Sequence, residues 1–117
     1  MPAALHVIVG QLKQYLGVDR VRLLDVPCGD LQWMGRFLQS RTDVEYTGMD
    51  IVGEVIDHHR KMFSDRPWKF LNVDIVSEPI DVTEYDLIMM RITDVKTFLH
   101  FYHLIKNALL TFCFILQ

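Results

Sequence analysis

The chain lacks the features that mark several large classes of protein. Only two of its 117 residues are cysteine, Cys28 and Cys113, so it has no disulfide framework of the kind that holds small secreted domains together. The first ten residues lack a basic segment followed by a long apolar core, and no secretory signal is predicted. These absences indicate a reducing, cytoplasmic setting.

Long hydrophobic runs and a dominant positive charge are also absent. The apolar segment 108–116 is shorter than the ~20 residues that span a bilayer, so a membrane anchor is not favoured. The formal net charge is −3 and the basic residues form no block, which argues against nucleic-acid binding through phosphates. Hydrophobic residues make up 50% of the sequence, enough for the core of a single domain over 1–117.

Hydrophobic periodicity divides the chain into alternating helices and short strands. Helical spacing predicts helices over about 3–16, 31–40, 53–63 and 94–109. Short apolar runs predict strands over 21–26, 45–51, 68–73, 86–90 and 111–116. Residues 77–81 are expected to form a loop, and Asp30 is expected to cap the helix that follows it.

Strands that alternate with helices predict an α/β fold with a parallel sheet and helices on both faces. Right-handed crossovers put about five strands in the order 3-2-1-4-5, within a three-layer α/β/α sandwich. In such a sheet a ligand binds beside strand 1, outside the carboxyl ends of the strands.

Acidic residues end the first two predicted strands. Asp25 is followed by the turn Pro27-Cys28-Gly29-Asp30, and Asp50 comes 21 positions after Gly29. Gly29 lets the backbone approach a ligand, and Asp25 can accept hydrogen bonds from an ammonium group or from loop amides. A carboxylate at Asp50 can accept both hydroxyls of a ribose. The layout is that of a nucleotide-type ligand lying across two parallel strands.

This layout resembles the cofactor site of class I S-adenosylmethionine-dependent methyltransferases. The family pattern after strand 1 is acid-x-Gly-x-Gly, and this chain reads Asp25-Val26-Pro27-Cys28-Gly29, with Leu31 in place of a further glycine. A subgroup with Pro-Cys-Gly-Asp and an aromatic residue three positions later is matched by Trp33. The resemblance covers residues 20–91 and implies a Rossmann-like core that binds S-adenosylmethionine.

The resemblance also implies a set of cofactor-binding residues. They are Asp25, Pro27, Cys28, Gly29, Asp30, Trp33, Asp50, Ile51, Asp74, Ile75 and Arg91. Asp74 would accept a hydrogen bond from the adenine amine, while Ile51 and Ile75 pack on the ring. Arg91 follows strand 4, where the family has its catalytic or substrate-facing loop. The resemblance identifies no catalytic residue and no methyl acceptor.

The acidic and aromatic residues also have interpretations without a ligand. Asp25 and Asp30 could stabilise a turn and cap a helix, and Asp50 or Asp74 could be a solvated acid after a strand. Trp33, like Trp68, fits a core position when taken without the resemblance.

An NAD-type oxidoreductase is the less favoured enzyme class. The glycines that admit a pyrophosphate in such enzymes are replaced here by Pro27 and Leu31.

Cysteine and histidine residues add no predicted chemistry. A thiol at Cys28, near a helix N-terminus, is expected to have a lowered pKa, yet to pack as a small residue under the turn. His58 and His59 are adjacent and His100 and His103 lie one turn apart, without a third ligand at clear spacing. No metal site is therefore expected.

The sequence predicts an S-adenosylmethionine-dependent methyltransferase with an unknown acceptor. The alternative is a non-catalytic, methyltransferase-like binding or regulatory protein. Members of the family usually continue past strand 5 into elements that cover the substrate, so an end at Gln117 would mean a C-terminal truncation and low activity. The apolar strand 111–116 would then be an exposed edge that a second copy or a partner covers.

Overall fold

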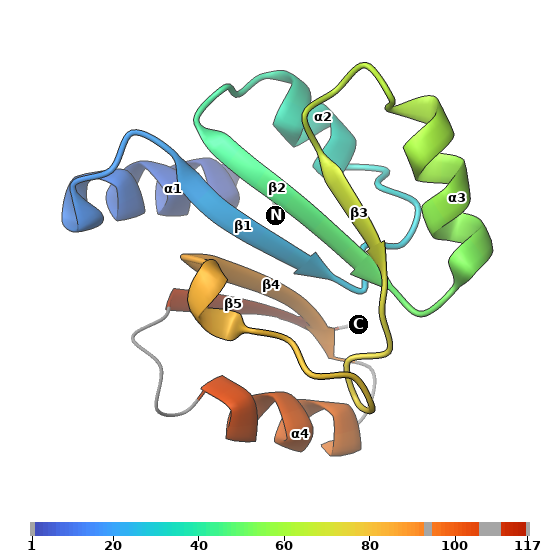
Figure 1. Ribbon diagram of the computed structural model, residues 1–117. Coiled ribbons are helices and arrows are strands. Elements are labelled where there is room, and N and C mark those ends of the chain that lie inside the picture. Colours follow the sequence, from blue (N-terminus) through green and yellow to red (C-terminus); the bar gives the residue numbers. More distant parts are fainter. Residues whose placement is uncertain (1, 93–94, 106–110, 117) are drawn as a thin grey trace.

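The computed structural model describes residues 2–92, 95–105 and 111–116, which form a parallel sheet with helices on both faces (Figure 1). The elements in chain order are α1 (Pro2–Leu16), β1 (Val21–Val26), α2 (Met34–Gln39), β2 (Val44–Asp50), α3 (Gly53–Met62), β3 (Lys69–Asn72), the 3-10 helix η1 (Val82–Glu84), β4 (Leu87–Ile92), α4 (Val95–Ile105) and β5 (Thr111–Leu116). The predicted alternation of helices and strands is confirmed. Of the predicted helix 94–109, residues 94 and 106–109 lie outside the described residues.

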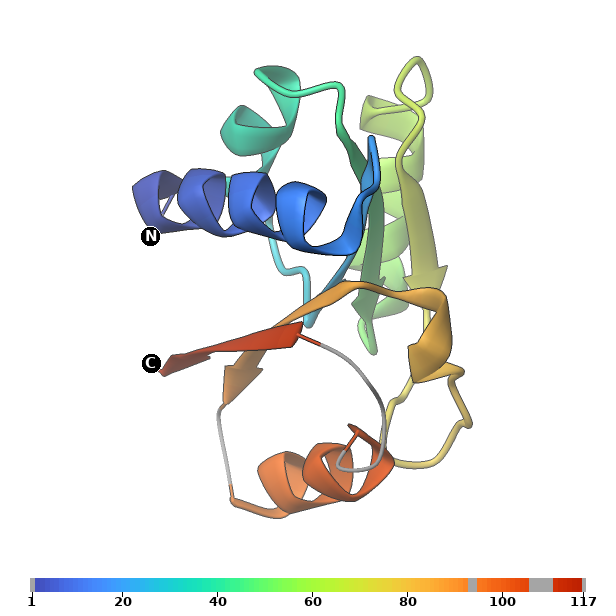
Figure 2. The same ribbon diagram turned by 90° about the vertical axis from the view of Figure 1, so that its left-hand side faces the viewer.

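The sheet has the strand order β3-β2-β1-β4-β5, as predicted, and every neighbouring pair is parallel. β1 lies at the centre, where Leu23 is in register with Tyr46 of β2 and Leu87 of β4. Figure 2 shows β4 and β5 between α1 above and α4 below. The Rossmann-like sandwich brings the carboxyl ends of β1, β2 and β4 to one edge of the sheet.

Both faces of β1 are buried because both are covered, which explains its nearly continuous apolar sequence. Val21 and Leu23 face a cluster that includes residues of α1, α2 and α3. Leu24 and Val26 face a second cluster that includes residues of η1 and β4. Hydrophobic burial on both sides fixes the position of β1, so the acid at its carboxyl end has a rigid support.

The predicted helix cap at Asp30 is wrong. α2 begins at Met34, and the Oδ1 atom of Asp30 accepts a hydrogen bond from the backbone N–H of Gln32 at 3.0 Å. Gly29 and Leu31 both have positive φ angles, 57° and 60°. A right-handed helix cannot include such residues, so the turn extends to Leu31 and the helix starts later than its hydrophobic spacing indicates.

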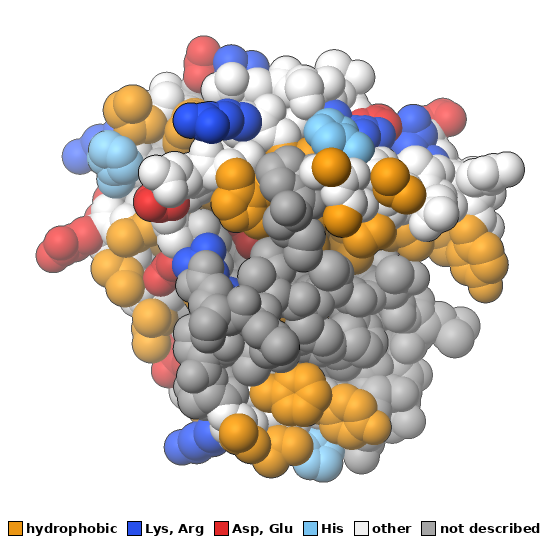
Figure 3. All heavy atoms as spheres, turned by 180° about the vertical axis from the view of Figure 1, so that it is seen from behind, with side chains coloured by type: hydrophobic (Ala, Val, Ile, Leu, Met, Phe, Trp, Pro, Cys, Tyr) orange, Lys and Arg blue, Asp and Glu red, His pale blue; other side chains and the backbone are white. Residues whose placement is uncertain are grey.

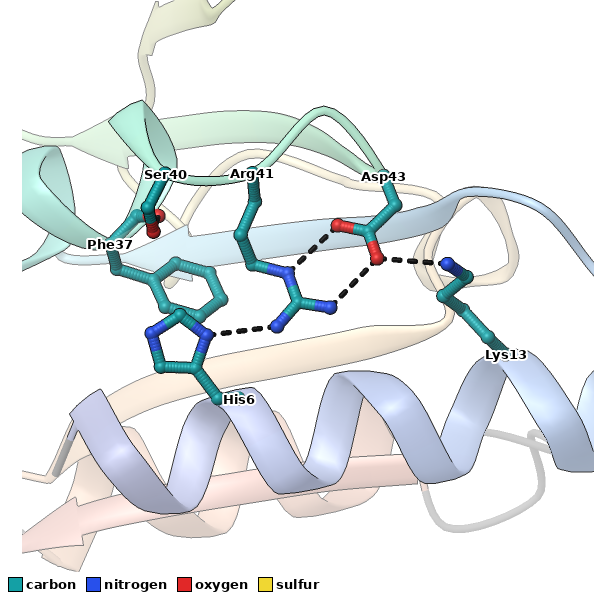
Figure 4. Close-up of polar contacts among 6 residues, drawn as sticks. All are labelled: His6, Lys13, Phe37, Ser40, Arg41 and Asp43. Atoms are coloured by element: carbon teal, nitrogen blue, oxygen red, sulfur yellow. Dashed lines mark hydrogen bonds and ion pairs between the residues drawn. The ribbon is translucent and has the colours of Figure 1, made fainter.

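An ion-pair cluster at the opposite, amino-terminal edge of the sheet ties α1 to the segment before β2 (Figure 4). Asp43 accepts hydrogen bonds from Arg41 at 2.7 and 2.8 Å and from Lys13 at 2.9 Å. His6 Nδ1 lies 2.8 Å from the guanidinium of Arg41. The hydrogen bonds from Arg41 hold the pKa of Asp43 well below its usual range.

The surface of α4 is partly apolar. Val95, Leu99 and Tyr102 are 71%, 49% and 47% exposed, and hydrophobic side chains gather at the lower end of the molecule where α4 lies (Figure 3). Among the described residues, no helix combines the length and the hydropathy that crossing a membrane requires. β5 ends the strand order, and its covering by a partner stays a prediction.

Candidate functional site

Two cavities lie at the carboxyl edge of the sheet. The first, of about 340 Å³, is lined by Asp25, Pro27, Cys28, Asp30, Leu31, Gln32, Trp33, Met34, Met89, Met90 and Arg91. The second, of about 210 Å³, is lined by Val26, Pro27, Asp50, Ile51, Val73, Asp74, Ile75, Val76 and Arg91. Pro27 and Arg91 line both, so the two cavities are neighbours on either side of the turn that follows β1.

The predicted site residues come together at these cavities. Every one of them except Gly29 lines the first cavity, the second, or both. Gly29 lines neither cavity, but its backbone N–H donates to Oδ2 of Asp50, a residue of the second cavity, at 3.1 Å. Residues that are far apart in the sequence thus form one continuous site.

Asp50 organises the turn after β1. Its Oδ2 accepts from Gly29 and its Oδ1 accepts from the backbone N–H of Val52 at 2.9 Å. The residue is only 6% exposed. Each carboxylate oxygen has a second lone pair, so Asp50 can still accept hydroxyl groups of a ligand in the second cavity.

The left-handed conformation of Gly29 is the reason that this position needs glycine. A Cβ atom there would lie 3.5 Å from Nη1 of Arg91, at ordinary contact distance, so the main cost of a side chain is backbone strain. The turn is also bound to β2, because the N–H of Cys28 donates to the carbonyl of Met49 at 2.9 Å.

Asp25 is a buried acid at the wall of the first cavity. It is 9% exposed, and Tyr46 donates its hydroxyl to Oδ2 at 2.7 Å. Burial raises the pKa of Asp25 from 3.8 to about 7, while the hydrogen bond from Tyr46 and the charge of Arg91 act in the opposite direction. A cationic ligand group beside Asp25 would stabilise the ionised carboxylate.

Cys28 packs as predicted, but the expected lowering of its pKa is wrong. The residue is 4% exposed, and its Cβ would be 3.1 Å from a Cβ built at Gly48. Burial, followed by the charges of Asp25 and Asp50, raises the pKa of the thiol to about 12. Cys28 therefore stays a neutral thiol and is no nucleophile.

Asp74 and the apolar residues near it line the second cavity. The carboxylate of Asp74 accepts from the N–H of Val76 and from Oγ of Ser77, both at 3.0 Å, so it stabilises its own turn. Ile75 is 8% exposed and Ile51 is 63% exposed. Together they give the second cavity an apolar wall at which a flat ring can pack.

Two residues that support the site were not predicted from the sequence. Tyr46 reaches Asp25 from β2, and His59 of α3 has Nε2 2.6 Å from the carbonyl oxygen of Gly29. Because a carbonyl only accepts, Nε2 of His59 carries the proton. His59 is 3% exposed and its Nδ1 has no partner within the described part of the chain. Its place beside Ile56 on the buried face of α3 was the only signal in the sequence.

No group of three or more His, Cys, Asp and Glu residues among those described is arranged to hold a metal ion. The adjacent His58 and His59 differ in burial, with His58 exposed and His59 buried.

Comparison by sequence finds no matching family model and no matching curated protein. Solved structures do match. The plantazolicin methyltransferase BpumL, in complex with a pentazolic desmethylPZN analog and SAH, aligns with a TM-score of 0.69 and 17% identity over 94% of this chain and 44% of that chain. The PH0226 protein from Pyrococcus horikoshii OT3 has a TM-score of 0.61 and 18% identity over 97% of this chain and 57% of that one.

PKMT2 from Rickettsia typhi, in complex with AdoHcy, has a TM-score of 0.63 and 17% identity over 80% of this chain. The chain spans 19% of PKMT2 and 32% of another BpumL structure, so it corresponds to part of each of these proteins. Similarity at this level of identity shows the shared fold.

Proposed function

We propose that this chain is a class I methyltransferase-type domain that binds S-adenosylmethionine and transfers its methyl group to an unidentified acceptor. The observation that carries the proposal is the pair of neighbouring cavities that share Pro27 and Arg91, beside a turn held by the hydrogen bond from Gly29 to Asp50. BpumL and PKMT2, which share the fold, were solved with SAH and AdoHcy, the demethylated form of this donor. The proposed binding core is 20–91, with the Pro-Cys-Gly-Asp turn of the subgroup. The cytoplasmic location stays a prediction.

The two cavities differ in a way that suits the two ends of this ligand. The second has the apolar wall of Ile51 and Ile75 for adenine and Asp50 for the ribose hydroxyls. The first has Asp25 for the ammonium group and the guanidinium of Arg91 for the carboxylate of the methionine part. The donor's sulfur would lie near the turn at Gly29, between the two.

The chemistry requires little from the protein beyond placement. The bound donor supplies a methyl group on a positively charged sulfur, which is already activated for transfer. The residues of the chain then have to hold the ligand in one orientation and exclude water from it. Asp25, Asp50 and Arg91 would supply the orientation, and Met89 and Met90 of β4 supply apolar lining in the first cavity.

Turnover with a donor carrying a radiolabelled methyl group tests the proposal. The 117-residue protein is incubated with a cell extract and a panel of small molecules, alongside Asp50→Ala and the control Asp57→Ala. Asp57 is an acid on α3 whose side chain is 71% exposed. We expect labelled products from the wild type and from Asp57→Ala, and a large loss with Asp50→Ala.

Two other outcomes have a clear meaning. If the donor binds in calorimetry but no labelled product forms, the result would support the non-catalytic binding protein instead. Neither binding nor transfer would refute the proposed function.

A further inference from the structure

The side chain of Tyr46 passes over Gly48 of β2 to contact Asp25 near the end of β1. It is 1% exposed, and Gly48, two residues further along β2, is in register with Asp25 of β1. A Cβ atom at Gly48 would lie 2.8 Å from Oη of Tyr46 and 3.2 Å from its Cε1. Real Cβ atoms do not come so close, so glycine at position 48 provides the space through which the tyrosine reaches Asp25.

The ring of Tyr46 is held by its neighbours. Trp68 and Phe70 pack against it edge-on, with ring centroids at 6.3 and 6.0 Å. Burial, together with the negative charge of Asp25, raises the pKa of Tyr46 well above 10. Its hydroxyl therefore remains protonated, and a hydrogen-bond donor, at neutral pH.

One carboxylate oxygen of Asp25 accepts a hydrogen bond from this tyrosine, and the other is available to a ligand. Oδ2 accepts from Tyr46 at 2.7 Å, and within the described part of the chain no donor reaches Oδ1. The residue lines the first cavity. The other titratable or charged groups that act on it are Cys28, Asp50 and Arg91.

From this geometry we infer that Tyr46 is a positioning residue for the donor site. It fixes the Asp25 carboxylate at the wall of the first cavity and favours its ionised form, so that Asp25 accepts the ammonium group of the ligand. The identity of that ligand rests on the proposed function. Tyr46 does not touch the ligand itself, and it acts through Asp25.

The variant Tyr46→Phe removes the hydroxyl and keeps the ring. Tyr85→Phe is the matched control, because Tyr85 is also buried (8% exposed) but belongs to the cluster on the other face of the sheet. The first measurement needs no ligand: the Asp25 carboxyl is titrated by carbon-13 NMR in the free protein. We expect its pKa to rise in Tyr46→Phe and to stay unchanged in Tyr85→Phe, because only the former removes a hydrogen bond to the carboxylate.

The second measurement is the affinity for S-adenosylmethionine at pH 6 and pH 8.5. The ratio of variant to wild-type affinity cancels the titration of the ligand's own amino group. At pH 6 binding must ionise Asp25, so Tyr46→Phe should bind about tenfold more weakly, and the ratio should approach one at pH 8.5. The analogue 5′-methylthioadenosine has no ammonium group, so its affinity should not differ between the proteins.

The two measurements separate the possible failures. An unchanged pKa of Asp25 in Tyr46→Phe overturns the inference, whether or not the ligand binds. A shifted pKa with an affinity loss that is equal at both pH values also overturns it, since a merely structural role would produce that result. If the wild type binds no S-adenosylmethionine, the proposed function fails and the inference about a donor site fails with it, while the titration still decides the link between Tyr46 and Asp25.

Discussion

Ionised Asp25 should lower the free energy of unfolding, and the variant Asp25→Asn should show by how much. Burial is the largest cause of the rise in the pKa of Asp25 from 3.8 to about 7, a difference of about three units. At ~1.4 kcal/mol per unit, ionised Asp25 costs the folded state about 4 kcal/mol at pH 8. Asparagine can still accept a hydrogen bond from Tyr46, but its amide group is buried, and this offsets ~1–2 kcal/mol of the gain in stability. We therefore expect Asp25→Asn to be about 2 kcal/mol more stable than the wild type at pH 8.

The size of the difference in stability depends on pH in a way that no simple packing change would reproduce. Because the folded-state pKa is raised, the stability from protonated Asp25 is fully present below about pH 4 and is lost as the pH rises through 7. The advantage of Asp25→Asn should thus vanish at pH 4.5 and be complete at pH 8. Urea unfolding followed by the fluorescence of Trp33 and Trp68 measures it at both pH values. An equal difference in stability between the two proteins at pH 4.5 and pH 8 would show that ionisation of Asp25 is not its cause.

Three further predictions concern the site and its support. Asp50→Ala should weaken S-adenosylmethionine binding by ~1–3 kcal/mol in calorimetry, because ribose hydroxyls and the N–H of Gly29 lose their acceptor; unchanged affinity in a folded variant would remove Asp50 from the site. Gly29→Val should abolish donor binding in the same assay while the circular dichroism stays close to that of the wild type, since φ is 57° there. Asp43→Ala should cost about 1 kcal/mol at pH 7 in thermal unfolding, because it removes the acceptor of Arg41 and Lys13. The pKa of Asp43 is lowered in the folded state, so this stability is present above its ordinary pKa and should be lost as the pH falls below about 4.

The sequence was sufficient for the strand order and for the gathering of the strand-end acids at one edge of the sheet. Parallel strands align their carboxyl ends, so residues that end β1 and β2 must meet at one edge, and Asp25 and Asp50 do. The hydrophobic pattern and the positions of the acids are enough to predict that meeting.

Contacts that depend on side-chain reach could not be predicted in the same way. The hydrophobic pattern around Tyr46 and His59 indicates that both are buried. It does not show that Tyr46 contacts Asp25 or that His59 contacts the carbonyl of Gly29. The pKa of Cys28 was predicted in the wrong direction, because the distance to the helix end and the depth of burial are both tertiary quantities. The late start of α2 follows from the positive φ of Leu31, a conformation that its residue type does not favour.

The proposed donor site can be tested by titration calorimetry of the 117-residue protein with S-adenosylmethionine, S-adenosylhomocysteine and NAD. We expect both adenosyl ligands to bind at one site per chain, both to bind more weakly to Asp50→Ala, and NAD not to bind. Binding of NAD, or binding of neither adenosyl ligand by the folded protein, would contradict the proposed site.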